Sequence, residues 1–204
     1  MIDLKSDKKF IINLPKRTDR KLSSLMQLSN LKIENYEFIE AVDGETLEQP
    51  TKHKKGALGC KLSHLIAIQK AKDNKLPHCI ILEDDCDIDQ HILVKFANWQ
   101  SQIPNDWELL YLGAHNNRPL RMISDNIGKC ITSLSTIAYI VRDSIYDLLL
   151  TELQEDEILD IKYVNLIHFG KIKGYCVSPN LVVQKAGFSN IEGMNVNYSK
   201  YYRK

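Results

Sequence analysis

The chain has 204 residues, of which 44% are hydrophobic and 26% are charged, and this composition is that of a globular protein rather than a disordered or fibrous one. Its 27 Lys and Arg residues nearly balance 26 Asp and Glu residues, which argues against nucleic acid as the main partner. The length predicts a single domain that spans residues 1–204.

The cysteines and the N-terminus predict a reducing compartment. The five cysteines include no Cys-x-x-Cys pair and are odd in number, which disfavours a zinc knuckle or a complete disulfide framework. We find neither a signal peptide nor about 18 consecutive apolar residues. A cytoplasmic setting follows, or the host-cell cytoplasm if the chain is viral, while peripheral membrane contact and the oligomeric state stay open. Five histidines and cysteines between residues 53 and 79 also lack the spacing of zinc ligands, and we expect them to have structural roles. They are His53, Cys60, His64, His78 and Cys79.

The first part of the chain predicts parallel strands joined by a helix. Residues 9–14 and 36–41 are compact apolar strand signals, and between them Leu22, Leu25 and Met26 fall at helical spacing. The order strand, helix, strand predicts a parallel pair in an α/β sheet, with the helix crossing over. In such sheets ligands bind at the carboxyl ends of the strands.

Basic residues follow the first of these ends. Arg17 and Arg20 come just after the strand at residues 9–14, where they could hold a phosphate, or else solvate a turn. A further helix is predicted over residues 56–71, and its glycines have the spacing of neither a Walker A loop nor a dinucleotide motif. His64 on this helix could contact a phosphate when protonated, and a core position is the alternative.

Five acids follow a short apolar strand at residues 80–82. Carboxylates gathered at the end of a buried strand repel one another unless a cation or hydrogen-bond donors offset their charge. The interpretations are a divalent metal site and a solvated turn with capping duties. A calcium-binding EF-hand is excluded because Gln90 and Phe96 stand where its glycine and glutamate are required. The five acids are Glu83, Asp84, Asp85, Asp87 and Asp89.

The second half predicts more strands and helices around a polar loop. We expect helices over residues 90–102 and 143–159, and strands over residues 107–113 and 131–141. Residues 114–129 are polar and predict a loop available to a substrate. After Asp160 the pattern is less regular; an extended segment is expected at residues 175–184, and a surface tail ends at residues 201–204.

These motifs, in their order, resemble glycosyltransferase family 25, which includes lipopolysaccharide glycosyltransferases and collagen hydroxylysine galactosyltransferases. The resemblance spans nearly the whole chain. It rests on Ile12-Asn13-Leu14 with Arg17 and Asp19-Arg20, Ala41-Val42-Asp43-Gly44, Gly56-Ala57-Leu58-Gly59-Cys60 with Ser63-His64, Ile81-Leu82-Glu83-Asp84-Asp85, Leu110-Tyr111-Leu112-Gly113, Ser135-Thr136-Ile137-Ala138-Tyr139, Asp160, and residues 179–184 with Ser189 and Ile191.

The resemblance implies a GT-A fold, a Rossmann-like α/β sandwich that binds a nucleotide sugar and Mn²⁺ or Mg²⁺. Asp85 and Glu83 are the implied metal ligands, since alternate residues of a strand share one face. Ser135 departs from the family, which often has glycine there. The implied donor-binding residues are Asn13, Leu14, Arg17, Arg20, Asp43, Gly44, Ser63, His64, Glu83 and Asp84.

The activity implied is transfer of a hexose, galactose or glucose, from a UDP-sugar to a hydroxyl of a glycan or protein, with inversion. Inversion requires a general base, for which Asp160 is the candidate and a helix cap the alternative. Two other functions stay open. One is a non-catalytic binding module with this fold. The other is a phosphatase that uses Asp85 and Asp87, although Asp89 stands where its motif has Thr or Val.

Overall fold

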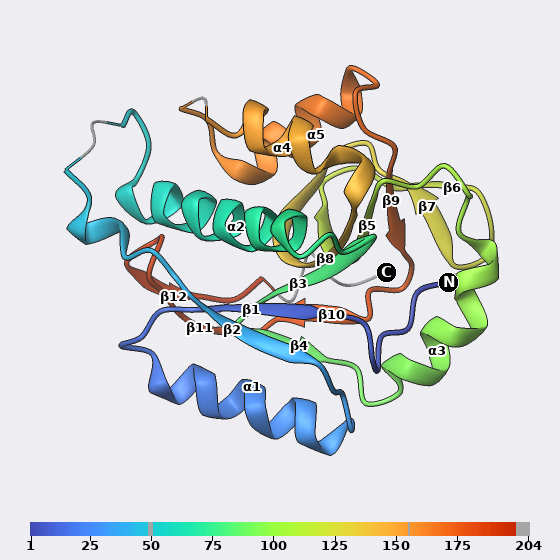
Figure 1. The fold of residues 1–204 in the computed structure, drawn as a ribbon, viewed down its shortest axis with the longest axis horizontal. Helices are drawn as coiled ribbons and strands as arrows, with labels where there is room; N and C mark the ends of the chain where they lie inside the picture. Colours follow the sequence, from blue (N-terminus) through green and yellow to red (C-terminus); the bar gives the residue numbers. More distant parts are fainter. Residues whose placement is uncertain (49–50, 155, 199–204) are drawn as a thin grey trace.

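A mixed β-sheet runs through the centre of the molecule. The computed structural model describes residues 1–48, 51–154 and 156–198, and its largest sheet has eight strands (Figure 1). From one edge to the other these strands are β2 (Tyr36–Glu40), β1 (Lys9–Asn13), β3 (His78–Glu83), β8 (Ser133–Arg142), β5 (Leu109–Asn116), β9 (Gly174–Val177), β7 (Ile127–Lys129) and β6 (Arg121–Met122).

The three strands at one side of the sheet are parallel, which confirms the prediction from the order strand, helix, strand. β1 pairs in parallel with both β2 and β3. The crossovers contain α1 (Thr18–Asn30) and α2 (Lys55–Asp73), and these helices cover opposite faces of the sheet (Figure 1). Because parallel strands end at the same edge, the turns that follow β1, β2 and β3 meet there.

Successive residues of the parallel strands enter two cores, one on each face. Phe10 packs in the same core as Ile68 of α2, and its neighbour Ile11 packs in the core that contains Leu28 of α1. All four side chains are at most 1% exposed. This burial on both faces explains why the strands are continuous apolar runs in the sequence. The other helices extend these layers: α3 (Ile92–Trp99), α4 (Tyr146–Glu152) and α5 (Leu159–His168).

The apolar face predicted for α1 is wrong. Leu22 and Met26 are 60% and 58% exposed, whereas Ser24 and Leu28 are buried. The Ser24 hydroxyl donates to the backbone carbonyl of Asp84 at 3.2 Å, so a small polar side chain occupies the contact between the helix and the acidic segment. The burial of Ser24 depends on this long-range hydrogen bond, which cannot be predicted from hydrophobic periodicity.

The second half departs from the prediction at three places. The helix expected over residues 143–159 is divided into η3 (Asp143–Ile145) and α4, and the segment after Asp160 is helical as part of α5. The helix expected over residues 90–102 is α3 followed by η2 (Gln100–Gln102). Residues 114–129 include β6 and β7, which pair with each other at the sheet edge opposite β2.

Two short sheets bring the C-terminal part of the chain against the acidic segment. β4 (Cys86–Ile88) pairs with β10 (Val182–Gln184), and β11 (Gly187–Ser189) pairs with β12 (Met194–Val196). The tail predicted at residues 201–204 lies outside the described residues. The five cysteines are free, as expected. Within the described ranges, no helix combines the length and apolar character that crossing a membrane requires.

Candidate functional site

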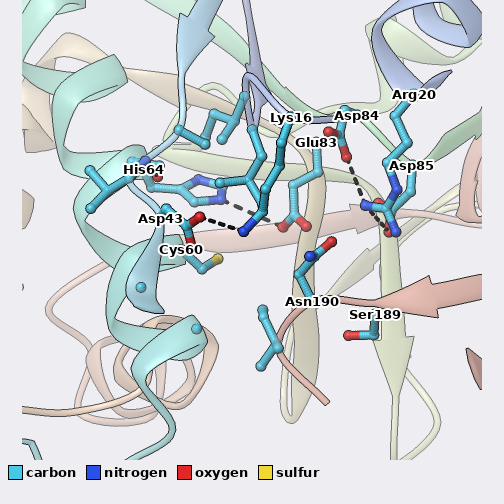
Figure 2. Close-up of a pocket in the computed structure, with 18 of the residues that line it drawn as sticks. Lys16, Arg20, Asp43, Cys60, His64, Glu83, Asp84, Asp85, Ser189 and Asn190 are labelled. Atoms are coloured by element: carbon cyan, nitrogen blue, oxygen red, sulfur yellow. Dashed lines mark hydrogen bonds and ion pairs between the residues drawn. The ribbon is translucent and has the colours of Figure 1, made fainter. Parts of the chain in front are cut away.

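A cavity of about 120 Å³ opens where the parallel strands end (Figure 2). Its walls come from the turn after β1, the segment after β2 with η1 (Gly44–Thr46), the first turns of α2, and the segment that follows β10. We call this the first cavity. Nine of the residues implied for donor or metal binding line it: Leu14, Arg20, Asp43, Gly44, Ser63, His64, Glu83, Asp84 and Asp85.

Arg20 lies against the acids rather than in solvent. Its Nη1 is 2.8 Å from Asp84 Oδ1 and 3.1 Å from Asp85 Oδ2, and its Nη2 donates to the Phe188 carbonyl at 2.6 Å. The Arg20 side chain is only 18% exposed. A solvated turn therefore does not describe Arg20, which is a charged wall of the cavity held by two carboxylates.

Arg17 and Asn13 support the cavity from outside its lining. Arg17 Nη2 is 2.8 Å from Asp19 Oδ2, and this carboxylate raises the pKa of the guanidinium. Arg17 Nη1 also donates to Asn190 Oδ1 at 2.9 Å. The buried Asn13 amide donates to Asp84 Oδ2 at 2.7 Å. Both residues position groups that line the cavity.

The segment after β2 is packed tightly against α2. Ser63 is fully buried, donates to the Gly59 carbonyl at 2.6 Å and accepts from the Val42 N–H at 2.9 Å. A Cβ on Gly44 would lie 2.1 Å from the Lys55 carbonyl oxygen. Gly44 and Ser63 therefore hold the two segments together, and Asp43 forms an ion pair with Lys16, which also lines the cavity (Figure 2).

The acidic turn, Glu83 to Asp85, does not continue the strand. Glu83 ends β3, and the next two acids lie in a turn before β4, so strand alternation does not extend to Asp85. Asp85 Oδ2 accepts from Gln184 at 3.1 Å, while its buried Oδ1 has no hydrogen-bond partner among the described residues. Burial, with the charge of Glu83, raises the pKa of Asp85 to about 6. Burial likewise raises the pKa of Asp84.

Asp87 and Asp89 are separate from this turn. Asp87 is an exposed residue of β4, which removes the support for a phosphatase that pairs it with Asp85. Asp89 accepts from the His91 N–H at 2.7 Å and from Lys95 at 2.6 Å, immediately before α3. Of the five acids for which capping was one interpretation, Asp89 therefore acts at the start of a helix, whereas Asp87 does not.

Glu83 is held by Thr136 and faces His64. Thr136 donates to Glu83 Oε1 at 2.8 Å, and His64 Nε2 lies 3.5 Å from the same oxygen. Burial acts to raise the pKa of Glu83, but His64 and Thr136 outweigh it, so that the pKa is lowered. The His64 ring is 0% exposed, and its Nδ1 is 2.9 Å from the Tyr139 hydroxyl. His64 is thus a core residue with one edge turned to the cavity.

Potential metal ligands also gather beside Glu83. Among the described residues, the ligand atoms of Cys60, His64 and Glu83 all lie within 4.8 Å of one another. The sequence predicts structural roles for this cysteine and histidine, because they lack the spacing of zinc ligands. Their separation by four residues places both on one face of α2, which is the signal that could have found them.

A second cavity, of about 600 Å³, adjoins the first. Asp160 lines it from the first turn of α5, and Asp160 Oδ2 accepts a hydrogen bond from the Ser135 N–H at 3.1 Å. Burial raises the pKa of Asp160. The residues that line both cavities are Cys60, Glu83, Gln184, Ser189 and Ile191. Three of these come from the C-terminal part of the chain, from which no site residue was predicted.

Comparison with known proteins decides the family. The family described as glycosyltransferase family 25 (LPS biosynthesis protein) matches residues 6–145. The chain belongs to glycosyltransferase family 25. The matched segment covers β1, the acidic turn and all of β8. Most residues that line the first cavity lie within it, whereas Asp160 and other residues of the second cavity follow it in the chain.

Relatives of this family 25 chain include two curated proteins that are much longer. A protein of Acanthamoeba polyphaga mimivirus, named as an inferred glycosyltransferase, is 42% identical in an 88-residue match that covers 37% of this chain and 27% of that protein. Human procollagen galactosyltransferase 2 is 30% identical in a 129-residue match that covers 52% of this chain and 20% of that protein. The matched segment is thus about a quarter or less of each relative's length.

A solved structure supports the fold. The crystal structure of a glycosyltransferase involved in the glycosylation of the major capsid of PBCV-1 matches with a TM-score of 0.52 and 14% identity, over 91% of this chain and 95% of that chain. At this identity the likeness concerns the fold alone. It confirms the α/β sandwich of GT-A type that the sequence predicted.

Proposed function

We propose that residues 1–204 form a metal-dependent, inverting hexosyltransferase, which moves galactose or glucose from a UDP-sugar to a hydroxyl of a glycan or protein. The observation that carries this proposal is the continuity of the two cavities. Glu83 lines both, the acidic turn lies on one side, and Asp160 lies on the other. Charged groups for a donor and a carboxylate for an acceptor hydroxyl therefore occupy adjoining spaces, as a transfer reaction requires.

The donor belongs in the first cavity. Lys16 and Arg20 present cations where the strands end, and such groups bind diphosphate oxygens strongly. Lys16 is paired with Asp43, and Arg20 with Asp84. Both cations are therefore held by carboxylates of the same cavity, which orients them before a donor binds. The cavity residues Leu14, Gly44 and Ser63 supply backbone and packing surfaces for the nucleotide.

Mn²⁺ or Mg²⁺ is the cation that suits the acidic turn. The Asp85 Oδ1 oxygen is buried without a hydrogen-bond partner in the described ranges, and hard carboxylate oxygens are the ligands that these ions prefer. Asp85 and Glu83 would hold the ion, while Asp84 is kept in place by Arg20 and Asn13. When bound, such an ion stabilises negative charge on the leaving diphosphate.

The acceptor belongs in the second cavity, with Asp160 as the general base. A base must take the proton of the acceptor hydroxyl as that oxygen attacks the sugar. The Ser135 N–H fixes one Asp160 oxygen, Oδ2, at 3.1 Å, so Oδ1 can face the hydroxyl. Because burial raises the pKa of Asp160, this carboxylate is a stronger base than an exposed aspartate.

The test is release of UDP from a panel of UDP-sugars, with simple hydroxyl acceptors and with Mn²⁺ either present or chelated. We expect release from UDP-galactose or UDP-glucose only when the ion is present. Calorimetry measures the binding of UDP. It distinguishes a protein that binds the donor but is inactive under the assay conditions from one that does not bind the donor. Absence of both UDP binding and metal-dependent release for every donor would overturn the proposal.

A further inference from the structure

Cys60, His64 and Glu83 form a group with mixed sulfur, nitrogen and oxygen donors at the junction of the two cavities. α2 presents the cysteine and histidine one helical turn apart, and the end of β3 presents the glutamate (Figure 2). Their ligand atoms lie within 4.8 Å of one another. Atoms bound to one tetrahedral zinc ion lie roughly 3.3 to 3.6 Å apart, as follows from bond lengths of about 2.0 to 2.3 Å. Small rotations of the side chains would close the difference.

The histidine is already oriented for such a role. The imidazole is stacked on Tyr139, with ring centroids 5.7 Å apart and planes at 17°. His64 Nδ1 lies 2.9 Å from the Tyr139 hydroxyl, which lies 3.2 Å from the Tyr163 hydroxyl. The remaining nitrogen, Nε2, is buried, makes no hydrogen bond in the part of the chain that the structure describes, and faces Glu83 Oε1 at 3.5 Å. Metal-binding histidines are typically fixed in this way through the nitrogen that does not bind the metal.

The donor set distinguishes this group from the acidic turn. Thiolate and imidazole ligands favour Zn²⁺, whereas Mn²⁺ and Mg²⁺ favour oxygen. We propose that Cys60, His64 and Glu83 form a second cation site, which binds a thiophilic divalent cation such as Zn²⁺. On binding, the Cys60 thiol loses its proton to solvent and Sγ bonds to the ion. Cys60 lines both cavities, which gives the ion an entry path.

Glu83 connects this site to the donor site. If Glu83 is a ligand of the Mn²⁺ or Mg²⁺ ion, as the proposed function has it, a zinc ion beside Cys60 withdraws that ligand. Zn²⁺ is then an inhibitor whose effect excess Mn²⁺ relieves. This consequence rests on the proposed function, whereas binding of the thiophilic ion does not.

Cobalt provides the direct test, since a thiolate bound to Co²⁺ gives a charge-transfer absorption that oxygen-bound Co²⁺ does not. We expect this band on adding Co²⁺ to the full chain under reducing conditions, and its loss when Zn²⁺ is added. Cys60→Ser removes the band, and His64→Gln weakens Co²⁺ binding. Cys130→Ser is the matched control, because Cys130 is a buried thiol outside both cavities, and it keeps the band.

Alkylation gives a second readout that needs no variant. With Zn²⁺ at about ten times its Kd, modification of Cys60 by iodoacetamide slows about tenfold, because only the unbound fraction reacts. Peptide mass spectrometry follows the site. The proposal is overturned by a folded wild-type protein without a thiolate band, by a band that persists in Cys60→Ser, or by alkylation of Cys60 that Zn²⁺ does not slow. A failure of the proposed transferase activity would leave the cobalt band unchanged, so the two failures are distinguishable.

Discussion

The Ser135 N–H donates a hydrogen bond of 3.1 Å to the Asp160 carboxylate while Ser135 itself holds a left-handed φ of 72°. Residues other than glycine adopt this conformation at a cost of roughly 1 to 2 kcal/mol. Such strain persists where the surrounding structure fixes the backbone, as it does at many functional sites. The turn of the backbone at Ser135 aims its N–H at the carboxylate that we propose as the base.

Asp160→Asn should remove the base while keeping this hydrogen bond, since the amide oxygen still accepts from Ser135. We expect kcat to fall by about 10² to 10⁴, the range typical of a lost general base, with UDP affinity unchanged. Steady-state UDP release and calorimetry measure the two quantities. Asp147→Asn is the control, because that side chain is 81% exposed on α4. A normal kcat in Asp160→Asn would exclude Asp160 as the base.

Ser135→Gly should relieve the left-handed strain. We expect the free energy of unfolding to rise by about 1 kcal/mol, since glycine adopts this φ without steric cost. The N–H that bonds Asp160 is retained, so activity should be retained as well. Urea denaturation measures the change. Ser133→Gly, at an ordinary strand position two residues earlier, should lower stability; a gain from both substitutions would show that strain is not the cause.

The parts of the site that the sequence predicted are those built from short, regular segments. Apolar runs located β1 and β3, and the rule for parallel strands placed Arg20 and the acidic turn at one edge of the sheet. The position of Asp160 in α5 was not predicted, because its helix follows a weak pattern in which Asp160 and Lys162 interrupt the apolar residues.

The parts of the site that could not be predicted from the sequence depend on contacts between segments far apart in the chain. Gln184 reaches Asp85 across 99 positions, and Asn190 reaches Arg17 across 173. A polar residue in a short extended segment carries no sign of such a partner. The burial of Ser24 in α1 has the same origin, since its hydroxyl bonds the backbone of the acidic turn. Local sequence patterns therefore locate the helices and strands, but they do not show which distant segments complete the walls of the cavities.

Asp85→Asn should stabilise the metal-free protein at neutral pH. The folded pKa of about 6 exceeds the ordinary 3.8, so the folded state binds this proton more tightly than the unfolded state does. The contribution of Asp85 to the free energy of unfolding is therefore favourable below pH 4 and is lost as the pH rises to about 6. At about 1.4 kcal/mol for each pKa unit, we expect a gain of roughly 3 kcal/mol for the variant near pH 7.5 that vanishes near pH 4.

Urea denaturation in a chelating buffer, at several pH values, measures this gain. Asp89→Asn is a control for which the expected change in stability has the opposite sign. Burial acts to raise the pKa of Asp89, but Lys95 and the His91 N–H outweigh this effect, so that the pKa is lowered. Asp89→Asn should therefore lose stability at neutral pH. The account of Asp85 fails if its variant is less stable than wild type at pH 7.5. Metal-dependent UDP release should be lost in Asp85→Asn despite its greater stability.

Gly59→Ala tests the close packing that forms the wall of the first cavity. A Cβ at Gly59 would lie 2.5 Å from the Val42 carbonyl oxygen and 2.7 Å from the Gly44 nitrogen. Both are backbone atoms, so α2 or the segment after β2 must move. Overpacking of this kind costs about 1 to 3 kcal/mol, and the shift should also weaken UDP binding, because Gly44 lines the cavity. Gly187→Ala is the matched control, since no atom lies within 4 Å of its added Cβ. Equal melting temperatures and UDP affinities for the two variants would show that the glycine at position 59 is not required for packing.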